Sequence, residues 1–146
     1  MRILLLAVPL TIASLVCHGQ DSRSVLSIQP DPTAGQPVAK ELAPPQLAGM
    51  IGSPSVFVYD CNEVETYSEA HVPGAVLLVF DQVTLDKLPP DRNAKLVFYC
   101  YSPQCPAGAM AASTAMSLGF VDVYCMIEGI TGWQEAGLPT EPKSDK

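Results

Sequence analysis

Four short apolar runs, separated by segments of different character, most constrain what this chain can fold into. The runs combine β-branched and aromatic residues without the alternation of a half-buried strand, so we expect strands that are buried on both faces. Helix-like or linking segments follow them, an order typical of an α/β domain with a mainly parallel sheet. The predicted strands are VFVYD (56–60), AVLLVF (75–80), KLVFYC (95–100) and DVYCMI (122–127).

Helix signals fall between these runs. Asn62 is a preferred N-cap residue and Glu65 follows three positions later, which predicts a capping box. Pro106 suits the first turn of another helix, and Gly119 suits the position just after its end. A further helix is predicted over PQLAGMIG (45–52), before the first strand.

The first residues are typical of a secretory signal peptide. Arg2 precedes an uncharged run over residues 3–16, which is shorter than the roughly 20 apolar residues that a spanning helix needs. We therefore expect residues 1–19 to be removed and the protein to be exported, either periplasmic or secreted, without a transmembrane segment. Lipid anchoring at Cys17 is the less favoured alternative, because Val16 is unusual directly before an acylated cysteine.

The rest of the chain is expected to contain a leader, one folded domain and a tail. Residues 20–37 hold three prolines and no sustained periodicity, which predicts a flexible leader. Residues 140–146 are polar and predict a flexible tail. Residues 38–139 suffice for one hydrophobic core. The formal net charge of -7 disfavours nucleic acid as a partner.

Several polar or thiol side chains follow the predicted strands. The carboxyl ends of parallel strands meet at one edge of a sheet. Asp60 and Cys61 end one strand, Cys100 ends another and Glu128 follows a third, so we expect all of them at the edge of one pocket. Cys125 lies inside its strand and is expected to be a buried apolar residue.

Cys100 has the position of a nucleophile. It stands between a strand and a loop that leads to a helix N-terminus, where unpaired N–H groups and the helix dipole stabilise a thiolate. Simple packing at the top of the strand is the alternative role. The predicted active-site loop comprises Tyr101, Ser102, Pro103, Gln104, Cys105 and Pro106.

The folded unit resembles the rhodanese-like family along almost its whole length. The resemblance rests on VFVYDCNEVETYSEAHVPGAV, on LVFYC with the loop and helix after it, and on EGITGWQEAGLP. It implies a three-layer α/β fold around a mainly parallel sheet, with Cys100 as the nucleophile that carries a persulfide. His71 and Trp133 are expected to be structural. No cofactor is expected, and the cysteine spacing does not match a zinc module.

The loop departs from rhodaneses that use thiosulfate. Those usually carry a basic residue in or beside the loop, whereas no Lys or Arg occurs here between Lys95 and Lys143. Cys61 and Asn62 stand where a small residue and an Arg are frequent in the family, and Glu128 stands where a Gly is common. Thiosulfate, a dianion, is therefore expected to be a poor sulfur donor.

Three functions stay open at this point. The leading hypothesis is a sulfurtransferase or persulfide carrier that uses Cys100 with a small sulfur donor or a thiol acceptor, protein thiols included. The second is a thiol-disulfide redox protein in which Cys105 resolves a persulfide or sulfenic acid on Cys100. In the third, the fold serves as a non-catalytic binding module. Cys105 could also do no more than seal the start of the following helix.

We expect the mature protein to lack residues 1–19, because the short apolar run fits a cleaved signal and not a membrane span. N-terminal sequencing of exported material would measure this directly. Cytoplasmic protein that retains Met1 would contradict the prediction.

Overall fold

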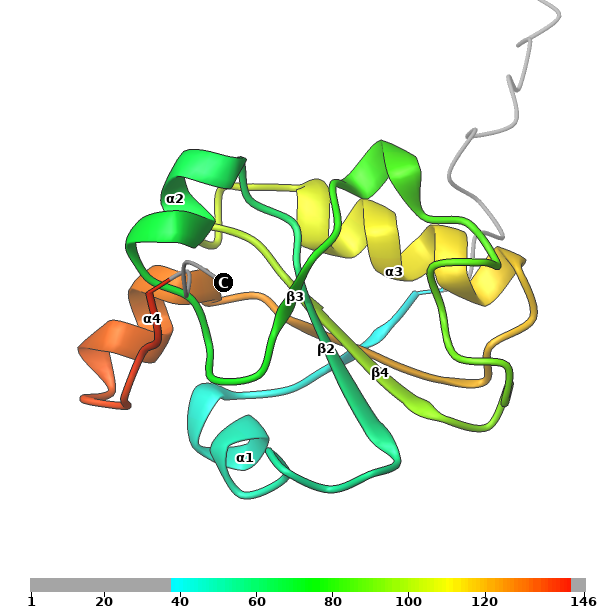
Figure 1. The fold of residues 1–146 in the computed structure, drawn as a ribbon, viewed down its shortest axis with the longest axis horizontal. Coiled ribbons are helices and arrows are strands. Elements are labelled where there is room, and N and C mark those ends of the chain that lie inside the picture. The colour runs from blue at the N-terminus through cyan, green and yellow to red at the C-terminus, as the bar shows by residue number, and fades with distance from the viewer. Residues whose placement is uncertain (1–37, 143–146) are drawn as a thin grey trace, which may run out of the picture. The chain divides into compact units, whose positions relative to one another are not determined.

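The structure is a computed structural model in which residues 38–142 are described (Figure 1). The signal peptide and leader predicted over residues 1–37 lie outside this range, as do residues 143–146. Within the described range, five strands form one sheet in the order β1-β5-β4-β2-β3, and all neighbouring strands are parallel. The strands are β1 (Lys40–Glu41), β2 (Val56–Asp60), β3 (Val76–Leu77), β4 (Lys95–Tyr99) and β5 (Asp122–Met126). The helices are α1 (Pro44–Ala48), α2 (Val64–Glu69), α3 (Ala107–Ser117) and α4 (Gly129–Glu135), with the 3-10 helix η1 at Phe80–Gln82.

Helices cover both faces of the sheet (Figure 1). One hydrophobic cluster lies between the sheet and α3 and includes Phe98 and Ala111. The other lies between the sheet, α1 and α4, and includes Val97, Leu47 and Trp133. Val97 and Phe98 belong to opposite clusters because successive side chains of a strand point to opposite faces. The predicted three-layer α/β fold with a parallel sheet is confirmed.

The central position of β4 explains its continuous apolar sequence. The strand lies between β2 and β5, and every residue from Leu96 to Tyr99 is fully buried. Val97 stands opposite Val58 of β2 and Tyr124 of β5. A strand that is covered on both faces needs apolar residues at successive positions, which is why the pattern of this segment does not alternate.

Small residues let α3 approach β4 closely. The buried face of α3 consists of Ala107, Gly108, Ala111, Ala112 and Ala115. A Cβ atom added at Gly108 would lie 3.1 Å from the Tyr99 Cα atom, so a larger side chain would push the helix away. The close approach sets the N-terminus of α3 against the end of β4, where Cys100 follows.

The edges of the sheet differ from the sequence expectation. The strand predicted over residues 75–80 is reduced to two residues, and the chain then turns into η1. This strand pairs only with β2, and Val76 is 58% exposed, so little burial holds a longer edge strand in place. At the other edge, the charged pair Lys40–Glu41 forms β1, which hydrophobic patterning did not predict.

The predicted helix ends need smaller adjustments. α1 begins at Pro44 and ends at Ala48, so the helix predicted over 45–52 is shorter at its C-terminal side. Pro106 is the N-cap residue of α3 and lies just before its first turn. Gly119 follows the C-cap of α3 with φ +98°, as its sequence position predicts. No helix between residues 38 and 142 combines the length and apolar character needed to span a bilayer.

The start of the predicted C-terminal tail is tied to the domain. Glu141 forms an antiparallel bridge with His71, in which each backbone N–H donates to the other residue's carbonyl at 2.8 and 2.9 Å. The Gly74 N–H also donates to the Glu141 carboxylate at 3.2 Å. Residues up to Glu141 therefore contact the folded unit.

Gly129 joins β5 to α4 at a point of very close backbone approach. Its φ is +65°, and an added Cβ would lie 2.5 Å from the Tyr101 carbonyl group. The two following N–H groups, of Ile130 and Thr131, donate to the carbonyls of Cys100 and Tyr101 at 2.9 and 3.0 Å. The absence of a side chain at Gly129 is what lets α4 hold the loop after β4.

Gly129→Ala is expected to lower the free energy of unfolding by about 2 kcal/mol or more, because it adds a backbone clash to an unfavourable φ. Urea denaturation would measure this loss. Gly137→Ala is the matched control, since Gly137 has a similar φ of +69° but open space around its Cα. Equal losses in the two variants would contradict a tight contact between α4 and the loop.

Candidate active site

Residues from the ends of β2 and β4 enclose a cavity of about 260 Å³. Cys61 follows β2 and Cys100 follows β4, so the parallel pairing brings them to the same edge, as the sequence predicted. Phe80 of η1 and residues of α2 complete the wall. The lining residues are Cys61, Asn62, Glu63, Thr66, Phe80, Cys100, Tyr101, Cys105 and Ala107.

Cys100 and Cys105 form a disulfide across the loop between β4 and α3. Their Cα atoms are 6.1 Å apart, and the Cys105 N–H donates to the Ser102 carbonyl at 2.9 Å, which turns the chain back. Cys100 is 6% exposed, whereas Cys105 is only partly buried. A thiol or persulfide reaching this pair from solvent therefore meets the Cys105 sulfur more readily.

The loop also presents backbone donors. Within residues 38–142, no protein group accepts a hydrogen bond from the N–H of Tyr101, Ser102 or Gln104. The first N–H groups of α3 add the unpaired donors of any helix start. Such N–H groups form a concave site that stabilises an anion without a charged side chain.

A buried carboxylate lies beneath the cavity. Asp60 is fully buried, and its Oδ1 accepts the backbone N–H and the side-chain amide of Asn62 at 2.8 and 2.7 Å. Its Oδ2 accepts the Tyr99 hydroxyl at 2.5 Å, and that hydroxyl accepts the Val72 N–H at 3.0 Å. Burial raises the pKa of Asp60, and the hydrogen bonds from Tyr99 and Asn62 act against this rise. Asp60 does not line the cavity but acts on it through Asn62.

Asn62 does not have the helix-capping role that the sequence predicted. α2 begins at Val64 with Glu63 as its N-cap residue, and the Asn62 side chain turns inward to Asp60. Because a carboxylate oxygen only accepts, the Asn62 Nδ2 must face Asp60 and its Oδ1 faces Cys100, whose Sγ lies 3.6 Å away. A reduced Cys100 thiol could donate to this oxygen, whereas a disulfide sulfur has no hydrogen to donate.

The two free cysteines of the described chain are both buried. Burial raises the pKa of the Cys61 thiol strongly, and the neighbouring Asp60 raises it further. Burial also raises the pKa of Cys125 to about 11. Cys125 is 6% exposed and does not line the cavity, which agrees with its predicted role as a buried apolar residue.

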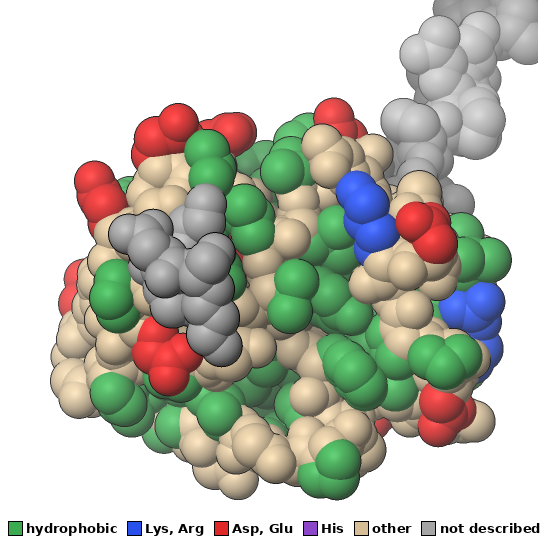
Figure 2. Space-filling model, viewed as in Figure 1, with side chains coloured by type: hydrophobic (Ala, Val, Ile, Leu, Met, Phe, Trp, Pro, Cys, Tyr) green, Lys and Arg blue, Asp and Glu red, His purple; other side chains and the backbone are tan. Residues whose placement is uncertain are grey.

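Negative charge surrounds the candidate site. Glu63 is the charged residue that lines the cavity, and Glu65 and Glu69 are exposed on α2. Figure 2 shows acidic side chains gathered over this part of the surface, whereas Lys and Arg side chains lie toward the other side of the view. An incoming anion is therefore repelled at the mouth of the cavity.

The described basic residues are engaged elsewhere. Lys40 and Lys95 both pair with Asp122, at 3.1 and 2.7 Å, near the starts of β4 and β5 and not at their carboxyl ends. The Arg92 guanidinium lies over the Phe120 ring. Lys87, beyond η1, donates to the Gln82 side chain at 3.0 Å. Within residues 38–142, no Lys or Arg lines the cavity of Cys100.

Glu128 does not reach the cavity of Cys100, contrary to the sequence prediction. It lines a separate cavity together with Glu41 and Gln46, because the chain turns sharply into α4 after β5. His71 is buried, stacks on Tyr67 and has its Nδ1 2.8 Å from the Tyr67 carbonyl oxygen, which agrees with a structural role.

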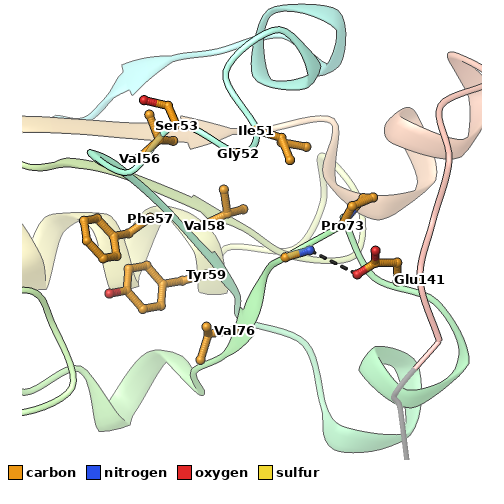
Figure 3. Close-up of a pocket in the computed structure, with 11 residues that line it drawn as sticks. Ile51, Gly52, Ser53, Val56, Phe57, Val58, Tyr59, Pro73, Val76 and Glu141 are labelled. Carbon is orange, nitrogen blue, oxygen red and sulfur yellow. Dashed lines mark hydrogen bonds between the residues drawn. The ribbon is translucent and has the colours of Figure 1, made fainter.

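A larger cavity, of about 380 Å³, lies near the beginning of β2 (Figure 3). Val56, Val58 and Pro73 give it a largely apolar wall, and its carboxylate, from Glu141, already accepts the Gly74 N–H. None of the cysteines in the described part of the chain lines it. The nucleophilic side chains Cys61, Cys100 and Cys105 line the smaller cavity instead.

Sequence reasoning missed the roles of Tyr99, Asn62 and Phe80. Tyr99 was part of an apolar run, and only strand pairing shows that its hydroxyl reaches Asp60. The two-residue spacing between Asp60 and Asn62 was the available signal, because Asp side chains often accept the N–H two residues further on. Phe80 enters the wall through the turn into η1, which no local pattern indicated.

The rhodanese-like domain family matches residues 43–136 of this chain. The match covers most of the described fold and includes both cysteines of the loop. A parallel sheet with helices on both faces and a cysteine at the end of β4 defines the same class of protein. The chain therefore belongs to the rhodanese-like family.

Individual relatives are distant in sequence. The chain is 26% identical over 97 residues to "Thiosulfate sulfurtransferase GlpE" of Pseudoalteromonas translucida, covering 66% of this chain and 90% of that protein. It is 29% identical over 79 residues to "Putative sulfur carrier protein YrkF" of Bacillus subtilis, covering 54% of this chain but only 42% of that longer protein. Among solved structures, the BH2092 protein from Bacillus halodurans has a TM-score of 0.65 at 26% identity, covering 73% of this chain and 82% of that one.

Tyr99→Phe is expected to lower the free energy of unfolding by about 1–3 kcal/mol, because the buried Asp60 and Val72 N–H each lose a partner. Urea denaturation would measure the loss. Tyr101→Phe serves as the control, since Tyr101 is 53% exposed and removing its hydroxyl should change little. A loss for Tyr99→Phe no larger than that of the control would rule out the buried network as a stabilising element.

Proposed function

We propose that this protein is a sulfurtransferase or persulfide carrier whose nucleophile is Cys100. The observation that carries the proposal is the position of Cys100 at the end of β4, beside backbone N–H groups that have no acceptor among residues 38–142. Those donors suit the anionic sulfur of a persulfide. The names of the relatives in Pseudoalteromonas translucida and Bacillus subtilis support sulfur transfer as the class of reaction.

The disulfide with Cys105 makes reduction the first step. An external dithiol reduces the bond, giving two thiols on the protein and a disulfide on the reductant. The Cys100 thiolate then attacks the outer sulfur of a persulfide donor, RSS⁻, forming Cys100–S–S⁻ and releasing RS⁻. An acceptor thiolate removes the outer sulfur and restores the Cys100 thiolate. Export, as predicted from residues 1–19, would favour the disulfide between cycles.

The charge of the cavity argues for a donor other than thiosulfate. Glu63 lines the cavity, and no basic side chain does so within residues 38–142. A dianion entering this site would lose hydration without a compensating cation. A donor with one negative charge or none, such as a small organic persulfide or a protein persulfide, meets less repulsion.

Thiol-disulfide exchange is the second candidate function. The observation that favours it is the disulfide itself, between one buried and one partly exposed cysteine. An oxidoreductase of this kind would transfer its disulfide to a partner dithiol and carry no sulfur atom. Whether a sulfur atom stays on Cys100 after reaction with a donor separates the two functions.

The test is mass spectrometry of the reduced protein after treatment with a sulfur donor. We expect one added sulfur on the peptide that contains Cys100 and none in Cys100→Ser. Without prior reduction, Cys100 should carry no persulfide, because its sulfur is bonded to Cys105. Return of the unmodified protein to the Cys100–Cys105 disulfide without sulfur retention, together with no added sulfur on Cys100 in Cys105→Ser, would reject the sulfur-carrier function.

Sulfur loading from thiosulfate is expected to be slower than loading from a small organic persulfide, and Gln104→Arg should improve thiosulfate use selectively. A charge-assisted contact to the donor would lower the barrier by about 1 kcal/mol or more. Gln104→Glu is the matched control, because it places the opposite charge at the same exposed position and should slow thiosulfate further. Fast thiosulfate turnover by the unmodified protein would show that the loop N–H groups suffice alone.

A further inference from the structure

We propose that Cys61 is a second disulfide partner of Cys100, so that Cys100 can bond either to Cys105 across the loop or to Cys61 across the sheet. The exchange requires only the disulfide that the structure contains and a free thiol beside it. It does not rest on the sulfur-carrier function. A third thiol at this site extends the chemistry beyond a single cysteine pair.

Cys61 and Cys100 directly follow Asp60 and Tyr99, the last pair of the β2–β4 ladder. Asp60 stands opposite Tyr99, and the Cys61 N–H donates to the Tyr99 carbonyl at 2.8 Å. That bond belongs to the last pair of the ladder, and continuing the register by one residue beyond it sets Cys61 level with Cys100. Neighbouring strands lie about 4.8 Å apart. Disulfides join Cα atoms that are about 4.4–6.8 Å apart, so the cross-strand spacing falls in the allowed range.

Both side chains lie on the same face of the sheet. Cys61 and Cys100 belong to the hydrophobic cluster under α3, together with Tyr59 and Phe98, which precede them by two residues on the same strands. They also line the same cavity, and Cys105 lines it with them. Three cysteine sulfurs therefore share one small space, and two of them can reach Cys100.

Cys125 does not meet these conditions. It stands opposite Phe98, two residues before Cys100 on β4, and it does not line the cavity. Two residues along a strand correspond to roughly 6.6 Å of displacement. Cys125 therefore serves as an internal comparison, since it is also a free buried cysteine but lacks the register of Cys61.

The proposed step conserves atoms and electrons. The Cys61 sulfur attacks the Cys100 sulfur, the Cys100–Cys105 bond breaks, and the proton of Cys61 passes to the Cys105 sulfur. The products are a Cys61–Cys100 disulfide and a free Cys105 thiol, with no external oxidant. Holding the reacting sulfurs on adjacent strands makes the step intramolecular, which offsets the low reactivity of a buried thiol.

The exchange changes which thiol is accessible. Before it, the free thiol among the three cysteines of the cavity is Cys61, which is buried and whose pKa burial raises. After it, the free thiol is Cys105, which is partly exposed next to the start of α3. The protein would thus present a reactive cysteine to a partner thiol or persulfide while Cys100 stays protected.

The experiment uses Cys105→Ser, which leaves Cys100 without its loop partner. After oxidation with oxidised glutathione, we expect a monomer whose mass is lower by two hydrogens and a cross-linked peptide pair that contains Cys61 and Cys100. Circular dichroism of the variant should match that of the unmodified protein. A stable glutathione adduct on Cys100, or a disulfide between Cys100 and Cys125, would overturn the proposal.

Matched double variants and the unmodified protein provide the controls. Cys61→Ser/Cys105→Ser should lower the yield of intramolecular disulfide by about tenfold or more, because no thiol is then held opposite Cys100. Cys105→Ser/Cys125→Ser should keep the full yield. The oxidised unmodified protein should be alkylated for increasing times. Molecules that have formed the Cys61–Cys100 disulfide should carry the label on Cys105 and none on Cys61. Labelling of Cys61 alone at all times, with Cys105 never labelled, would contradict the exchange and leave the sulfur-loading test unaffected.

Discussion

The parallel pairing of β2 with β4, from Val56 opposite Lys95 to Asp60 opposite Tyr99, is the constraint on which the site depends. Because the two strands end at the same level, the residues after them meet at one edge of the sheet. The same pairing buries Asp60 completely, and a buried carboxylate needs hydrogen-bond donors around it. Tyr99 and Asn62 supply them, and the second of these turns its amide oxygen toward Cys100.

The distribution of charge along the sheet limits which anions the cavity of Cys100 can attract. The ion pairs of Lys40 and Lys95 with Asp122 lie near the starts of the strands, while Glu63 stands at the cavity beyond their carboxyl ends. The positive potential available to an anion in this cavity comes from backbone N–H groups. A site of this kind can hold a sulfur anion that is attached to the protein, yet it offers little to attract a free dianion.

The cysteines make redox state part of the proposed function. With Cys100 bonded to Cys105, sulfur transfer must wait for a reductant, so the supply of reducing equivalents controls the proposed activity. Cys61 adds a third thiol to the cavity, which gives the pair a route to rearrange without leaving the protein. The proposed persulfide chemistry and the proposed disulfide exchange thus use the same sulfur atom, that of Cys100.

The sequence by itself determined the α/β class, the central strands and the position of Cys100, because apolar runs and strand ends are local properties that a linear pattern records. It also showed that the loop has no basic residue. Only the tertiary structure decided that Asn62 faces Asp60 instead of capping α2, that Glu128 lines another cavity, and that the strand at 75–80 is short. The first and last of these depend on burial that tertiary packing sets: Asp60 is buried once β2 pairs with β4 and then takes the Asn62 amide, and an edge strand gains little burial. The pairing of Cys100 with Cys105, and the position of Cys61 in the same cavity as Cys100, likewise follow from how the loop and the strand ends meet in space.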